Sequence, residues 1–98
     1  MPDQHQQAET IEQVRERLST VIDPEVGRGI VDMGLIYRIE ARPAGGLYIV
    51  MTTTTRGCPA SAFLTEAVRA CAASVPGVTG VDVELTYDPP WTPSMMSP

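Results

Sequence analysis

A chain of 98 residues, 43% of them hydrophobic, is long enough to fold as one domain with a buried core, and nothing in it suggests a second domain. The net charge is −5, and the seven basic residues are scattered arginines, so the basic patch of a nucleic-acid-binding protein is absent. The apolar runs are far shorter than the roughly 18 residues of a membrane span, and the polar start of the chain does not resemble a secretory signal. With two cysteines, we expect a protein of the reducing cytoplasm that binds neither nucleic acid nor membrane.

Residues 1–9, MPDQHQQAE, predict a mobile lead-in. Thr10 and Gln13 then fit the first and last positions of a capping box, which favours a helix that starts at Thr10. This helix should end by Asp23, because the residue before Pro24 is pushed away from helical geometry. Its core side should carry the apolar residues that recur at helical spacing, namely Ile11, Val14, Leu18, Val21 and Ile22.

The next segment, residues 23–34, contains three glycines and a proline and predicts a loop. It holds three carboxylates within ten residues: Asp23, Glu25 and Asp32. Turn capping by aspartate side chains explains Asp23 and Asp32, but it explains Glu25 less readily. A carboxylate cluster can also bind a metal ion or perform acid–base chemistry, and the spacing alone does not decide between these interpretations.

Two strands joined by a turn should follow the loop. Residues 35–42 alternate between apolar and polar side chains, residues 43–46 form a glycine-rich turn, and an apolar strand returns over residues 47–51. The β-branched threonines 52–55 extend this second strand. Alternate threonine hydroxyls then face opposite sides, so one pair can point towards the turn at Cys58.

Cys58 lies between the second strand and a second helix. Pro59 suits the first helical position, which puts Cys58 at or beside the N-cap, facing the amide hydrogens of Ala60 and Ser61. These amides and the helix dipole favour a thiolate. The alternative is that Cys58 is only a small, half-buried apolar residue at a turn.

The second helix presents one broad apolar stripe, and Cys71 lies within it, so we interpret Cys71 as a core residue. A disulfide between Cys58 and Cys71 is excluded, because thirteen residues of helix span roughly 20 Å whereas bridged Cα atoms lie within about 7 Å. Pro76 and Gly77 end the helix, and the alternating residues 81–88 predict a third strand. The full stripe consists of Phe63, Leu64, Ala67, Val68, Cys71, Ala72 and Val75.

The predicted order is helix, strand, strand, helix, strand, which implies a small α+β two-layer sandwich with both helices on one face of a sheet. Residues 10–98 should form this single domain, ending in a proline-rich tail without regular structure over residues 88–98. Trp91 in the tail either closes the edge or core of the sheet, or packs beside Cys58 or against a partner protein. The exposed sheet edge and the apolar tail favour a homodimer.

Three segments, residues 23–37, 51–59 and 87–93, together resemble the iron–sulfur cluster assembly family of the SufT/PaaD type. The resemblance implies a small α+β fold and a role in the maturation of iron–sulfur proteins, with the assembly machinery or client apo-proteins as partners. The chain departs from the family pattern at Gly29, where asparagine is common, and at Arg56, where proline is common. By the same resemblance, the functional cluster maps onto Asp23, Glu25, Asp32, Thr53, Thr54 and Cys58.

An iron–sulfur cluster normally needs four protein ligands, mostly cysteine, and one exposed thiol does not supply them. We therefore expect no stably bound cofactor, and only transient contact of Cys58 with iron, a cluster or a client protein. The alternative is an adaptor that binds proteins through the loop, the threonines and Trp91 without thiol chemistry. An enzyme is disfavoured, because the only histidine that could serve as a base is His5 in the lead-in.

Overall fold

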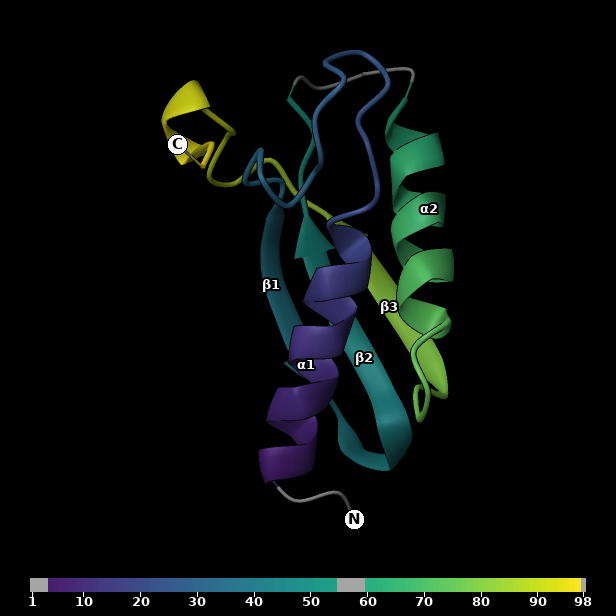
Figure 1. Cartoon of the computed structure of the whole chain (residues 1–98). Helices are drawn as coiled ribbons and strands as arrows, with labels where there is room; N and C mark the ends of the chain where they lie inside the picture. The colour runs from purple at the N-terminus through teal and green to yellow at the C-terminus, as the bar shows by residue number, and fades with distance from the viewer. Residues whose placement is uncertain (1–3, 55–59, 98) are drawn as a thin grey trace.

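The computed structural model describes residues 4–54 and 60–97. It contains two α-helices and three strands, in the predicted order and of the predicted α+β class (Figure 1). Both helices pack on one face of the sheet, as the sequence predicted. No helix in the described ranges is long and apolar enough to cross a membrane. The elements are α1 (Gln4–Leu18), β1 (Ile36–Ala41), β2 (Gly46–Met51), α2 (Ser61–Ala73) and β3 (Gly80–Leu85).

The sheet has the strand order β1-β2-β3. Strands β1 and β2 form the predicted antiparallel hairpin, with Ile39 paired to Ile49. Strands β2 and β3 are parallel, with Ile49 opposite Val83, and α2 makes the connection between them. The central strand therefore ends at the same end of the domain as β3, while β1 begins there.

The core lies between the sheet and the two helices. Strand β2 alternates strictly, with Leu47, Ile49 and Met51 buried and the residues between them half-buried. Helix α1 contributes Val14 and Leu18 to this core. The prediction that Ile22 lies on the core side of this helix is wrong, because the helix ends at Leu18 and Ile22 is 48% exposed. The remaining fully or almost fully buried apolar residues are Ile30, Met33, Leu35, Leu64, Val68, Ala72 and Val75.

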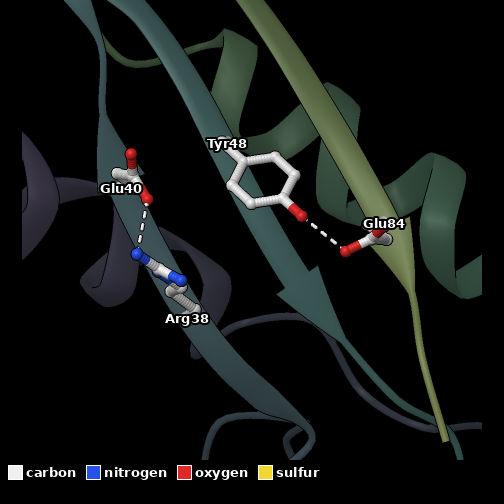
Figure 2. Close-up of polar contacts among 4 residues, drawn as sticks. All are labelled: Arg38, Glu40, Tyr48 and Glu84. Atoms are coloured by element: carbon white, nitrogen blue, oxygen red, sulfur yellow. Dashed lines mark hydrogen bonds and ion pairs between the residues drawn. The ribbon is translucent and has the colours of Figure 1, made fainter.

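The open face of the sheet is polar. Figure 2 shows Arg38 of β1 paired with Glu40, at 2.9 Å between Nη2 and Oε2, and the Tyr48 hydroxyl hydrogen-bonded to Glu84. Arg42 stacks over the ring of Tyr48 with its Cζ 4.4 Å from the ring centroid. The charged groups of this face are thus matched by neighbours on the same face.

The first helix begins at Gln4, so the start predicted at Thr10 and the capping role of Thr10 are wrong. Glutamine, alanine and glutamate are good helix formers, and they extend the helix beyond the apolar pattern. The helix ends at Leu18, where the hydroxyls of Ser19 and Thr20 bond back to backbone carbonyls of the last turn. The mobility predicted for residues 1–9 stays a prediction.

Helix α2 has Ala60 as its N-cap, with no side-chain cap, so the helix begins later than the Pro59 start that the sequence predicted. Cys71 packs against the core, as predicted, and its thiol is free. Phe63 does not belong to the core stripe, because 59% of it is exposed. The buried stripe is narrower than the spacing predicted. It consists of Leu64, Val68, Ala72 and Val75, and Phe63 lies beside it.

Candidate functional site

The predicted site residues come from two segments that meet at one end of the domain. The first is the carboxylate loop, residues 19–35, which connects α1 to β1, and the second is the segment Thr52–Thr54 after β2. The backbone N–H of Thr52 donates to the carbonyl of Leu35 at 2.9 Å, which joins the two segments. We call this end, together with the start of α2, the site end; it lies at the top of Figure 1.

Asp23 is 2% exposed and organises the carboxylate loop. Its Oδ1 accepts a hydrogen bond from the backbone N–H of Glu25 at 2.9 Å, and its carbonyl accepts one from Gly27 at 2.7 Å. Its own N–H donates to the carbonyl of Arg28 at 2.9 Å. The turn-capping interpretation of Asp23 is therefore confirmed: this carboxylate closes an Asx turn.

Glu25 and Asp32 differ from Asp23 because both are exposed. Within the described ranges, neither carboxylate makes a hydrogen bond or an ion pair. The Asp32 carbonyl accepts a hydrogen bond from Ser97 at 2.7 Å. Gly29 lies close by, and a Cβ built on it would be 3.1 Å from the carbonyl oxygen of Ser19. This tight approach explains why glycine suits position 29 in this chain.

Thr53 is 1% exposed, and its hydroxyl shares a 2.8 Å hydrogen bond with the hydroxyl of Tyr87. Thr52 is fully buried, and Thr54 is half-buried. Strand β2 ends at Met51, so the predicted extension of the strand through the threonines is wrong. The chain turns towards Leu35 there, and both Thr52 and Thr53 are buried. That alternate threonine hydroxyls face opposite sides stays a prediction.

Tyr87 is a residue of the site end that the sequence interpretation did not assign. Its hydroxyl reaches a threonine 34 residues earlier in the chain, a distance that no local pattern reveals. The signal available in the sequence was its place at the start of the third family-like segment, residues 87–93. Tyr87 therefore joins Asp23 and Thr53 as a buried or half-buried polar group of the site end.

The proline-rich tail is bound to the carboxylate loop, and we call residues 88–97 the strap. It contains a short 3-10 helix over Pro93–Met95, so the prediction of a tail without regular structure is wrong there. The Trp91 ring is half-buried against the core, and its Nε1 donates to the carbonyl of Met33 at 2.6 Å. Tyr37 donates from its hydroxyl to the carbonyl of Pro89 at 2.7 Å. The structural alternative for Trp91 is thus confirmed, while a contact of Trp91 with a partner stays a prediction.

Gly34 fixes how closely the strap approaches. Its φ of 78° lies in the left-handed region, and a Cβ built on it would collide with the carbonyl oxygen of Met95. Only glycine combines this backbone conformation with that contact. The loop carrying Asp32 and the strap therefore depend on each other.

Cys58, the predicted centre of the site, lies outside the described residues, together with Arg56 and Pro59. Among the residues that are described, no group of three or more histidine, cysteine, aspartate or glutamate side chains could hold a metal ion. The three carboxylates of the loop therefore do not form a metal centre by themselves.

This arrangement defines a small α+β domain, with buried polar groups and exposed carboxylates at one end. The family model of the iron–sulfur cluster assembly protein matches residues 11–84. The chain belongs to this family, as its three sequence segments indicated.

The relatives agree with this assignment. The chain is 42% identical to an Fe-S protein maturation auxiliary factor of Porphyromonas gingivalis, over 91% of this chain and 85% of that protein. It is 38% identical to the Fe-S protein maturation auxiliary factor SufT of Staphylococcus aureus, over 79% of this chain and 88% of that protein. It also matches the iron–sulfur cluster carrier protein of Mycobacterium tuberculosis at 38% identity, over 74% of this chain but only 19% of the carrier.

The fold matches a solved structure over nearly its whole length. The crystal structure of a domain of unknown function from Bacillus anthracis superimposes with a TM-score of 0.91, at 32% identity, covering 97% of this chain and 91% of that one. The relatives named above are auxiliary factors or carriers and not catalysts, which agrees with the prediction that this chain is not an enzyme.

Proposed function

We propose that this chain is an accessory factor in the assembly of iron–sulfur clusters or in their transfer to client proteins, and that Cys58 makes transient contact with iron, a cluster or a client cysteine. Membership of the family and the names of its relatives support the general role. The observation that supports the site is the joining of Thr52 to Leu35, which brings the carboxylate loop to the segment leading to Cys58.

Each residue of the proposed cluster has a distinct part. Asp23 and Thr53 are buried and hold the loop and the end of β2 in place through their hydrogen bonds. Glu25 and Asp32 offer exposed carboxylate oxygens, which attract iron cations arriving at the thiol. Thr54 adds a half-buried hydroxyl two residues before Arg56.

One thiol per chain supplies only one of the ligands that a cluster normally needs. Transient hand-over, with the remaining ligands supplied by the donor or by the client, fits this donor set better than storage. The match to an iron–sulfur cluster carrier supports cargo of this kind. The cytoplasmic location and the homodimer stay predictions.

The proposal is tested by comparing Cys58→Ala with Cys71→Ala, since Cys71 is a free thiol packed against the core. We expect Cys58→Ala to abolish maturation of iron–sulfur client enzymes in cells, with an unchanged circular dichroism spectrum. Cys71→Ala should keep maturation. Anaerobic reconstitution with iron and sulfide, followed by absorbance, should show cluster uptake that depends on Cys58. Full client activity with Cys58→Ala would contradict the proposal.

A second candidate is an adaptor that binds proteins in a maturation complex without thiol chemistry. The exposed apolar side chains of Ile22, Val26 and Phe63 favour it, because such side chains are typical of protein-binding surfaces. Co-precipitation of a known assembly protein that survives Cys58→Ser, together with normal client maturation, would support the adaptor over the thiol-dependent factor.

A further inference from the structure

Large apolar side chains are exposed at the site end. Among the described residues, four of them stand out: Phe63 is 59% exposed, Ile22 48%, Val26 47% and Leu85 37%. Ile22 and Val26 belong to the carboxylate loop, and Phe63 belongs to the first turn of α2. We call Ile22, Val26 and Phe63 the apolar rim; the loop and the start of α2 lie at the same end of the molecule in Figure 1.

Phe63 lies on the flank of α2 that faces α1. Phe63 and Ser74 are eleven residues apart, which is about three helical turns, so they share one flank. Arg17 of α1 donates to the hydroxyl of Ser74 at 3.0 Å and to its carbonyl at 3.3 Å. Helix α2 extends further towards the site end than α1 does (Figure 1). Helix α1 therefore does not cover the Phe63 end of this flank. The carboxylate loop, which follows α1, lies at this end of the molecule.

The charged side chains of the carboxylate loop form no ion pair with any residue that the structure describes. In the described part of the chain, ion pairs join Arg38 to Glu40, Arg42 to Asp82 and Arg69 to Glu66, and none of these residues is in the carboxylate loop. The loop exposes the carboxylates of Glu25 and Asp32 and the single cation of Arg28. Exposed apolar side chains next to unpaired acids complement a partner that carries an apolar side chain flanked by lysine or arginine. A second copy of this acidic chain would instead bring like charges together.

We propose that the apolar rim docks a segment of the client protein in which an apolar anchor is flanked by basic residues. This inference rests on the proposed function, because the client is the protein that receives the iron or the cluster. Phe63 is the expected centre of the contact, since a few aromatic and large apolar residues carry most of the binding energy of such interfaces. Glu25 and Asp32 accelerate and orient the approach of the basic client segment.

The first test compares the double variant Phe63→Ser/Val26→Ser with Leu85→Ser, which removes an exposed apolar side chain at the C-terminal end of β3, at the same end of the domain but not part of the rim. The double variant should keep the melting temperature and the Cys58-dependent cluster uptake, because both side chains are exposed. Its support of client maturation in cells should fall at least about tenfold. Leu85→Ser should keep client maturation. Full maturation with the double variant would overturn the inference.

The second test identifies the occupant. A photo-crosslinking benzophenone amino acid is placed at position 63 and, as a control, at position 48 on the open sheet face, and crosslinked segments are sequenced by mass spectrometry. We expect position 63 to capture a segment of an iron–sulfur protein with lysine or arginine beside the attachment point, and position 48 to capture none. Crosslinks mainly to a second copy of this chain, or equal capture at both positions, would overturn the inference.

The two proposals fail in different ways. If Cys58→Ala abolishes client maturation while the rim variants support it fully, the docking inference fails and the proposed function stands. If Cys58→Ala and the rim variants all support full maturation, both fail.

Discussion

The open face of the sheet and the site end are both exposed and both carry charged groups, but their charges are arranged differently. On the open face, Arg38 pairs with Glu40, and the Tyr48 hydroxyl bonds to Glu84 (Figure 2). At the site end, Glu25 and Asp32 have no such partner among the described residues. The polar groups of the open face are paired within the chain, whereas the site end offers carboxylates that can pair with groups of a second molecule.

The difference extends below the surface. The open face rests on the regular ladder of the sheet, so exchanging one of its side chains leaves the backbone supported. The site end is irregular backbone held by particular side chains, such as the Asp23 carboxylate, the Thr53 hydroxyl and the Trp91 indole. Substitutions that remove a similar side-chain group should therefore lower the free energy of unfolding more at the site end than on the open face.

The largest effect on stability is expected for Asp23→Ala. This variant removes the acceptor for the Glu25 N–H in a site that is 2% exposed. An unsatisfied buried group costs about 1–3 kcal/mol of unfolding free energy, measured by urea denaturation. Client maturation should fall as well, since the loop loses its turn. Asp23→Asn keeps an acceptor oxygen and should lose less stability; equal losses would show that the Asx turn is not the cause.

A smaller effect is expected for Trp91→Phe, which keeps a ring against the core but loses the hydrogen bond to the carbonyl of Met33. The expected loss is about 1 kcal/mol of unfolding free energy, from a lower urea midpoint at an unchanged denaturant slope. Proteolysis should then cleave the strap first. A variant as stable as the wild type, with an equally resistant strap, would show that this bond does not hold the strap.

The smallest effect is expected on the open face, from Tyr48→Phe. The hydrogen bond to Glu84 raises the pKa of Tyr48, so the folded state holds the phenolic proton more tightly than the unfolded chain does. Its contribution is complete below the unfolded pKa of about 10 and is lost as pH rises through the folded pKa. Tyr48→Phe should lower the urea midpoint at pH 7 only slightly, by less than Trp91→Phe does, and should remove this alkaline decline. A loss at pH 7 as large as that of Asp23→Ala would remove the contrast between the two regions.

Much of the fold follows from local patterns in the sequence. The alternation of Leu47, Ile49 and Met51 predicted the buried face of β2, and the repeat in α2 predicted the helix that covers it. The start of α1 was missed, because the polar residues before Thr10 have high helix propensity but no apolar repeat. Phe63 was misassigned to the core, because helical spacing gives the direction of a stripe but not its width.

The site could be predicted in composition but not in geometry. Family-like segments selected Asp23, Glu25 and Thr53, and the structure joins the two segments that carry them. The sequence did not predict that Asp23 is buried whereas Glu25 is exposed. This difference depends on the path that the loop takes between α1 and β1. The bond between Thr53 and Tyr87 joins residues far apart in the sequence and becomes visible only in three dimensions.

The collision that a side chain at Gly34 would cause with the carbonyl of Met95 also has an evolutionary consequence. Position 34 and the path of the strap cannot change independently. In an alignment of the family, a residue other than glycine at this position should occur together with a shortened or rerouted C-terminal segment. The pair then serves as a marker that separates members with a strapped loop from members whose loop is held in another way.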